Sequence, residues 1–272
     1  MGGIAERPVQ LTAHRAAWSG RYPENSLAAV RESYAERAAR VEIDALLIDG
    51  DFIVSHDPPR RGARLLRLSD VLDVALASPG MTLLEIDAKD LAPWPAGAAE
   101  RLARLVDPVR DRVVVTSPAD WNLRRLLRAD PALHVGFDPQ CHLDWTRDRD
   151  PLSPPRGAYG YLDAHPLSRR RALPPAAYLR ERLEEVVRMV PGVRELHLRL
   201  AFFERMQRDG LHDAAAVLHA AGALVDVWTL DAGTSRWRER LTRAIEAGVD
   251  VVTTNTPREL AAAVEVQGAQ GA

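Results

Sequence analysis

The chain has 272 residues, of which 46% are hydrophobic and 27% are charged, and its formal net charge at pH 7 is −2. A nearly neutral chain of this kind has no overall basic field, so its composition argues against nucleic acid as a partner. Its one cysteine, Cys141, excludes an internal disulfide bond and any zinc site built from several cysteines.

No stretch of about 18 apolar residues is present, so the sequence predicts no membrane-spanning helix and no integral membrane association. The first ten residues, MGGIAERPVQ, lack the apolar segment of a secretory signal. We therefore expect a soluble cytoplasmic protein.

Short β-branched runs alternate with amphipathic stretches along the whole chain. Eight strands are predicted, at 9–14, 40–48, 81–89, 112–117, 133–138, 194–200, 223–230 and 249–254. Eight helices are predicted between and after them, at 25–38, 68–78, 96–109, 119–129, 179–190, 211–221, 237–245 and 257–266. Strict strand–helix alternation requires a parallel sheet with right-handed crossovers. Eight such units at this length favour a single (β/α)8 TIM barrel domain with a core at about 9–266.

Two segments interrupt this alternation. After the second strand, Asp49-Gly50-Asp51 resembles a tight turn, and FIVSHD is predicted to return as a short strand. Residues 139–176 are rich in proline and follow the fifth strand, so they are predicted to form a long loop on the active face of the barrel.

Polar side chains lie on one face of several predicted strands, near the strand ends where barrel enzymes place their sites. Glu42 and Asp44 are two residues apart, as are Asp87 and Lys89, so each pair shares a strand face. Carboxylates inside an apolar sheet are costly unless they are paired or bind a metal. Oxygen ligands suit Mg²⁺, Ca²⁺ or Mn²⁺, and histidines near such an ion provide an acid and a base for phosphoryl chemistry.

Lys89 is the only lysine among 36 basic residues, which singles it out in a chain that otherwise uses arginine. With Arg15 it supplies positive charge that suits a phosphate group.

The ordered motifs H-R-A-x(6)-P-E-N-S, E-I-D, D-G-x(2)-I-V-S-H-D, I-D-A-K, V-W-T-L and T-T-N-T-P resemble the glycerophosphodiester phosphodiesterase family from about residue 9 to 260. The resemblance implies a (β/α)8 barrel that uses a divalent cation to hydrolyse glycerophosphodiesters to glycerol 3-phosphate and an alcohol. It implies two catalytic histidines, two phosphate-binding cations, three metal ligands and a pocket aromatic. By position, His14 and His56 match the catalytic histidines, and Arg15 and Lys89 match the phosphate-binding cations. The metal ligands match Glu42, Asp44 and Asp87, and the pocket aromatic matches Trp228.

Asn25 is a further candidate, for hydrogen bonding near the metal or a histidine, although asparagine is also a good helix N-cap. Other assignments have structural alternatives as well. Glu42 and Asp44 could pair with arginines, Asp87 with Lys89, and Trp228 could pack in the barrel. Glu85 is expected to be a buried structural partner, with metal binding as the alternative. Arg199 is expected to form an ion pair at the barrel rim, with an added anion contact as the alternative.

This chain departs from the family pattern at two positions. Ala16 stands where the family usually has glycine, and a methyl group there could narrow the pocket. Asp87 replaces a glutamate and is one methylene shorter. The family insertion after H-D is also reduced to PPRRGARLLR, so part of the pocket is expected from the loop 139–176.

These patterns predict a metal-dependent phosphodiester hydrolase of lipid and glycerol metabolism that acts on a small-molecule diester. Two alternatives remain open at this point: a related phospholipase D-like or phospholipase C-like phosphodiesterase, and a catalytically weak barrel that binds a phosphorylated ligand. The sequence names neither the released alcohol nor the oligomeric state.

Overall fold

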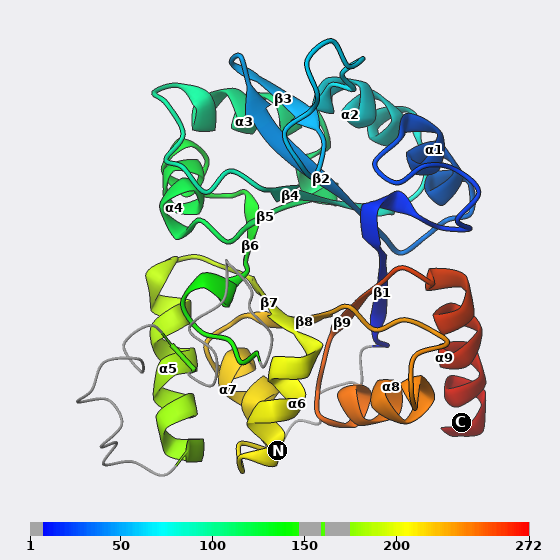
Figure 1. Cartoon of the computed structure of the whole chain (residues 1–272), viewed down its shortest axis with the longest axis vertical. Coiled ribbons are helices and arrows are strands. Elements are labelled where there is room, and N and C mark those ends of the chain that lie inside the picture. Colours follow the sequence, from blue (N-terminus) through cyan, green and yellow to red (C-terminus); the bar gives the residue numbers. More distant parts are fainter. Residues whose placement is uncertain (1–7, 147–158, 161–174, 272) are drawn as a thin grey trace.

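The structure is a computed structural model and describes residues 8–146, 159–160 and 175–271. Within these residues, eight parallel strands close into a barrel, which Figure 1 shows almost along its axis with helices around the outside. The strand order is β1-β9-β8-β7-β6-β5-β4-β2, and β1 pairs with β2 to close the ring. The predicted (β/α)8 architecture is confirmed.

The strands agree closely with the predicted ranges. In the described residues they are β1 (Gln10–Ala13), β2 (Arg40–Ile48), β3 (Asp51–Val54), β4 (Leu83–Ala88), β5 (Val113–Ser117), β6 (His134–Phe137), β7 (Glu195–Arg199), β8 (Leu224–Trp228) and β9 (Val251–Thr254). The short strand β3 runs antiparallel to β2, as the turn after the second strand predicts.

The helices of the described residues include one that the sequence pattern did not predict. They are α1 (Leu27–Ala35), α2 (Leu68–Ala77), α3 (Ala98–Val106), α4 (Asp120–Ala129), α5 (Pro175–Met189), α6 (Leu200–Arg208), α7 (Ala214–Ala220), α8 (Trp237–Glu246) and α9 (Pro257–Gly271). Short 3-10 turns lie at η1 (His14–Ala16), η2 (Asp107–Arg112) and η3 (Pro139–Cys141). The unpredicted helix is α6, which begins directly after β7 with no turn residue between them.

The barrel strands alternate apolar and polar residues. In β2, Val41 and Ile43 are fully buried in the hydrophobic core, which lies between the strands and the helices. Arg40, Glu42 and Asp44 alternate with them and project into the barrel. Burying each large aliphatic side chain contributes about 1.5–3 kcal/mol, so the outer layer stabilises the fold while the interior carries charge.

The loop 139–176 is described only in part, because 147–158 and 161–174 lie outside the described residues. The described part includes η3 and a β-bridge between Leu143 and Gly160. Its predicted contribution to the pocket therefore stays a prediction, apart from Gln140, which lines the site described below.

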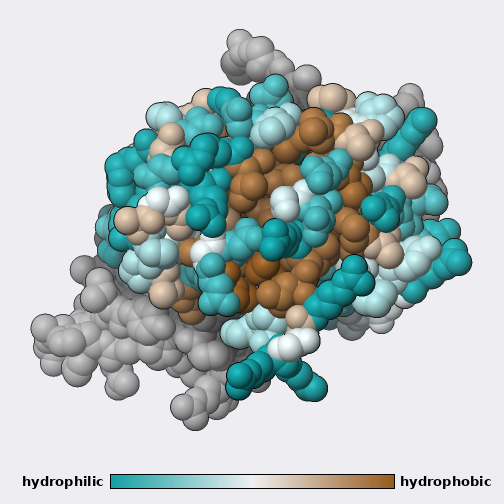
Figure 2. Space-filling model, turned by 90° about the horizontal axis from the view of Figure 1, so that it is seen from above, coloured by the Kyte–Doolittle hydropathy of each residue, from teal (hydrophilic) through white to brown (hydrophobic). Residues whose placement is uncertain are grey.

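A broad apolar area lies on the side of the molecule that carries α2 and β3, where Figure 2 shows apolar residues ringed by hydrophilic ones. A cavity of about 1100 Å³ on this side is lined by Leu27, Ile53, Leu65, Leu66 and Val74, among others. None of the predicted histidines or metal ligands lines it.

No helix within the described residues is both long enough and apolar enough to cross a membrane.

Candidate active site

A cavity of about 480 Å³ opens at the C-terminal ends of the barrel strands. Seven of the nine predicted site residues line it: His14, Arg15, Glu42, His56, Asp87, Lys89 and Trp228. They come from β2, β4 and β8 and from the segments that follow β1, β3 and β4. Parallel strands bring such residues together because all their carboxyl ends meet on one face of the barrel.

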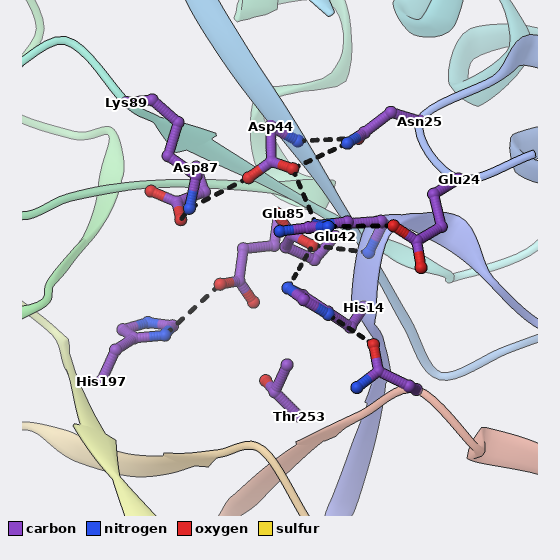
Figure 3. Close-up of polar contacts among 12 residues, drawn as sticks. His14, Glu24, Asn25, Glu42, Asp44, Glu85, Asp87, Lys89, His197 and Thr253 are labelled. Atoms are coloured by element: carbon purple, nitrogen blue, oxygen red, sulfur yellow. Dashed lines mark hydrogen bonds and ion pairs between the residues drawn. The ribbon is translucent and has the colours of Figure 1, made fainter. Parts of the chain in front are cut away.

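Glu42, Asp44 and Asp87 form an acidic group that we call the upper cluster. One carboxylate oxygen from each lies within 4.8 Å of the others. Neighbouring strands hold them in place, since Asp44 of β2 is in register with Asp87 of β4. The predicted metal ligands therefore converge, as Figure 3 shows.

Two cations contact the upper cluster. Lys89 Nζ lies 2.5 Å from Asp87 Oδ2 and 3.0 Å from Asp44 Oδ1, and Arg15 Nε lies 3.2 Å from Asp44 Oδ2. Burial alone would lower the pKa of Lys89, but the charges of Asp87 and Asp44 raise it, so the ammonium is kept. Burial likewise acts to raise the pKa of Asp44, but Lys89 and the Asn25 hydrogen bond lower it. Asp44 is therefore held as a carboxylate.

Glu42 is the exception in the upper cluster. Its Oε2 accepts a hydrogen bond of 2.6 Å from the backbone N–H of Arg15, but its Oε1 is buried and has neither a hydrogen-bond nor an ion-pair partner among the described residues. Burial, followed by repulsion from Asp44, raises the pKa of Glu42 well above its usual range. An unpartnered buried carboxylate oxygen beside two further carboxylates fits a hard divalent cation, which would hold all three groups ionised.

The two predicted catalytic histidines lie in different surroundings. His14 Nδ1 is 2.7 Å from Asn255 Oδ1, and its Nε2 lies 3.9 Å from Glu42 Oε2. His56 is 42% exposed, and its Nδ1 lies 3.1 Å from Asp57 Oδ1. Both rings line the cavity, but within the described residues only His14 is anchored by a hydrogen bond to the barrel framework.

Asn25 does not line the cavity; it acts on Asp44 instead. Its Nδ2 donates to Asp44 Oδ2 at 2.7 Å, and its Oδ1 accepts from the Asp44 backbone N–H at 3.0 Å (Figure 3). The N-cap of α1 is the next residue, Ser26, whose hydroxyl accepts from the Ala29 N–H. Asn25 thus fixes a carboxylate of the upper cluster rather than the helix end.

Trp228 lines the cavity at the end of β8. The guanidinium of Arg199 lies 6.0 Å from the centre of its ring, and Arg199 also pairs with Asp144 at 3.0 Å. The expected ion pair of Arg199 is therefore present.

A second charged group, the lower cluster, lies on the same inward faces and comprises Arg40, Glu85, Glu195, His197 and Asp226. Arg40 is 1% exposed and hydrogen-bonds to Glu195 at 2.7 and 3.1 Å and to Glu85 at 3.2 Å. His197 Nδ1 lies 3.3 Å from Glu85 Oε1 and 3.5 Å from Asp226 Oδ2. Glu85 is thus a buried structural partner, as expected.

Oxygen and nitrogen atoms of Glu85, His197 and Asp226 also lie within 4.8 Å of one another, as close as in the upper cluster. Burial alone would lower the pKa of His197, but Glu85 and Asp226 raise it to about 10, so the ring carries a proton at neutral pH. A protonated ring beside the fixed charge of Arg40 disfavours a metal ion there.

Ala16 does not narrow the cavity. It is fully buried, belongs to the hydrophobic core and is absent from the cavity lining. Its φ of 56° lies in the left-handed region, which explains why glycine suits this position. Alanine in place of glycine at position 16 therefore strains the backbone and leaves the cavity unchanged.

Sequence reasoning missed three residues that line or support the site. Asn255 stands in the T-T-N-T-P motif, whose sequence alone assigns it no role, and Asp231 holds it from the loop after β8. Asp138 follows β6 and lines the cavity, where burial raises its pKa to about 7. Their positions at or directly after the ends of predicted strands could have marked them as site candidates. Their spacing in the sequence, however, does not connect them to His14 or Lys89.

Residues 14–136 match the model of the Glycerophosphoryl diester phosphodiesterase family. The resemblance is confirmed over that part of the chain. The matched segment includes both predicted histidines, all three predicted metal ligands, Arg15, Asn25 and Lys89. None of the curated proteins matches the chain in sequence.

Solved structures extend the likeness in fold to nearly the whole chain. A glycerophosphodiester phosphodiesterase from Parabacteroides distasonis is 17% identical with a TM-score of 0.66, and the match covers 97% of this chain and 100% of that one. An Oleispira antarctica phosphodiesterase in complex with the product sn-glycerol-3-phosphate is 17% identical with a TM-score of 0.58, covering 94% and 96%. A glycerophosphodiester phosphodiesterase from Agrobacterium tumefaciens is 17% identical with a TM-score of 0.56, covering 92% and 97%.

Proposed function

We propose that this chain is a metal-dependent glycerophosphodiester phosphodiesterase that releases glycerol 3-phosphate and an alcohol. The observation that carries the proposal is the convergence of His14, His56, Glu42 and Asp87 on one cavity at the C-terminal face of the barrel, with Asp44 beside them in the upper cluster. The family match over 14–136 and the product named for the Oleispira protein support the same substrate class.

Glu42, Asp44 and Asp87 would hold the cation. The unpartnered Oε1 of Glu42 and the all-oxygen donor set fit Mg²⁺, Ca²⁺ or Mn²⁺ better than zinc. When bound, such an ion polarises the phosphate and lowers the pKa of a bound hydroxyl group. Asn25 keeps Asp44 in place through its two hydrogen bonds.

Arg15 and Lys89 would hold the phosphate. Both line the cavity and both stay charged, so they stabilise the negative charge that grows on the phosphoryl oxygens as the bond to the alcohol breaks. The two histidines would move the protons: one ring takes the proton from the attacking oxygen, and the other donates a proton to the departing alkoxide.

The decisive experiment measures glycerol 3-phosphate released from glycerophosphocholine and glycerophosphoethanolamine with Mg²⁺, Ca²⁺ or Mn²⁺, and again after EDTA. We expect EDTA-sensitive turnover that is lost in His14→Ala and in His56→Ala. His212→Ala is the matched control, because His212 is exposed and does not line the site cavity, and it should retain full activity.

Two outcomes would redirect the proposal. Turnover of lysophospholipids but not of the water-soluble diesters would favour a phospholipase D-like enzyme. Retained Mn²⁺ binding with no turnover of any diester would favour a phosphate-ligand-binding barrel.

A further inference from the structure

His14 is held by a chain of hydrogen bonds that reaches the other end of the sequence. Its Nδ1 lies 2.7 Å from Oδ1 of Asn255, which follows β9 and lines the same cavity. The opposite ring nitrogen, Nε2, lies on the side of Glu42. In the neutral ring, a hydrogen on Nδ1 therefore leaves Nε2 with a lone pair that can accept a proton.

Asp231 determines how the Asn255 amide is turned. Asn255 Nδ2 donates to Asp231 Oδ2 at 2.9 Å, and the Asn255 backbone N–H donates to Asp231 Oδ1 at 2.7 Å. The hydroxyl of Thr254 also donates to Oδ1, at 3.2 Å. If the amide were flipped, its oxygen would face Asp231 Oδ2, and two acceptors would be left in contact.

With the amide so turned, its oxygen faces His14 and can only accept a hydrogen bond. His14 Nδ1 must then carry the hydrogen, and in the neutral ring the lone pair is on Nε2. Among residues 8–146, 159–160 and 175–271, His56 has no comparable anchor, because its Nδ1 contacts Asp57, whose side chain is 85% exposed.

We propose that Asp231 and Asn255 are positioning residues that fix His14 as the Nδ1–H tautomer, with the Nε2 lone pair directed to the cavity. Resting on the proposed function, this makes His14 the base and His56 the acid. Nε2 takes the proton of the attacking oxygen as that oxygen bonds to phosphorus. The bond from phosphorus to the alcohol oxygen breaks, and the alkoxide takes a proton from His56.

The tautomer can be measured without any assay of turnover. Long-range ¹H–¹⁵N correlation spectra of the full-length protein labelled at histidine distinguish Nδ1–H from Nε2–H in a neutral ring. His14→Gln identifies the His14 signals by their loss. We expect Nδ1–H in the wild type and a mixture or the Nε2–H form in Asn255→Ala. An Nε2–H ring in the wild type, or an unchanged tautomer in Asn255→Ala, would overturn the proposal.

Kinetics provide the second arm. Asn255→Ala is expected to lower kcat by about 10- to 100-fold with little change in KM, which is typical of losing a group that orients a reacting histidine. The exchanged pair Asp231→Asn with Asn255→Asp keeps an acceptor opposite His14 and a donor behind it, so it should restore both the tautomer and most of kcat. Failure of the exchanged pair to restore either would count against the proposal.

Thr234→Ala is the matched control, since its hydroxyl contacts the backbone oxygen of Asp231 and not the carboxylate. It should leave the tautomer and kcat unchanged. If wild-type His14 is Nδ1–H but His14→Ala retains full turnover, the proposed base role fails while the positioning by Asp231 and Asn255 stands.

Discussion

The upper and lower clusters contain the same kinds of groups in one barrel, yet they differ in how their charges are matched. Each contains three carboxylates, and β4 supplies one to each cluster, Asp87 to the upper and Glu85 to the lower. In the lower cluster every carboxylate oxygen has a partner in Arg40, His197, His134 or Thr253. In the upper cluster Glu42 Oε1 has no partner in the part of the chain that the structure describes.

This difference indicates that the lower cluster stabilises the fold and that the upper cluster can bind a ligand, although some of their residues are close in sequence. A buried carboxylate that is fully paired contributes to a fixed arrangement, whereas one left without a partner favours a proton or an external cation. Glu85 and His197 of the lower cluster line the same cavity as Glu42 and Asp87, but their charged atoms already have partners in the protein.

The largest effect is expected from Glu42→Gln in the upper cluster. Loss of one ligand charge should lower kcat/KM by about 1000-fold, because metal assistance supplies several kcal/mol of transition-state stabilisation. The metal-free protein should be as stable as the wild type or more so, since an unpartnered buried carboxylate is removed. Steady-state turnover, Mn²⁺ titration calorimetry and urea unfolding test the three parts, and unchanged Mn²⁺ affinity would contradict the assignment.

The same chemical change in the lower cluster, Glu195→Gln, should have the opposite profile. It leaves the guanidinium of Arg40 buried with a weaker partner, which is expected to cost about 3–5 kcal/mol of unfolding free energy. Urea unfolding measures this loss. Mn²⁺ affinity should stay close to that of the wild type. A loss of Mn²⁺ affinity as large as in Glu42→Gln would show that both clusters contribute to metal binding and would contradict the prediction.

A pH dependence of stability should come from His197. Its pKa is about 10 in the folded protein against 6.5 for the free side chain, so its stabilising charge is fully present below pH 6.5 and is lost as pH rises through 10. Between pH 7.5 and 10 the unfolding free energy should fall by about 3 kcal/mol more in the wild type than in His197→Gln. This range lies above the pKa of about 7 to which burial raises Asp226. Parallel pH profiles for the two proteins would contradict the prediction.

Gly136→Ala should disturb the lower cluster by sterics alone. A methyl group at this position would lie 2.5 Å from His197 Nε2 and 2.8 Å from Thr116 Cγ2, so both must move. We expect a loss of about 1–3 kcal/mol, measured by urea unfolding. Gly80→Ala is the control, because its nearest neighbour would be 3.9 Å away, and equal losses in the two variants would count against a tight fit at Gly136.

Much of the fold was predictable because local pattern and global topology agree. The sequence R-V-E-I-D has period two, which places Val41 and Ile43 on one face and the charged residues on the other, and β2 spans the predicted range of 40–48. Helix α6 was missed because Arg199 ends β7 and Leu200 begins the helix, with no glycine or proline to mark the boundary.

The candidate site was predictable where its residues follow one another in short motifs. Seven of the nine predicted residues line one cavity, and the other two, Asn25 and Asp44, lie beside it and contact each other. Asn255 was not predicted to act there, because its contact with His14 joins the segments after β9 and β1, which are far apart in the sequence.

The sequence by itself determined the alternation of strands and helices and which strand faces are charged, because both follow from periodicities of two to four residues. Only the tertiary structure decided which charges find partners. Arg40 reaches Glu195 across 155 positions, and His14 reaches Asn255 across 241. Such contacts depend on closure of the barrel, because closure brings β1 beside both β9 and β2 and so places His14 next to Asn255 and Glu42.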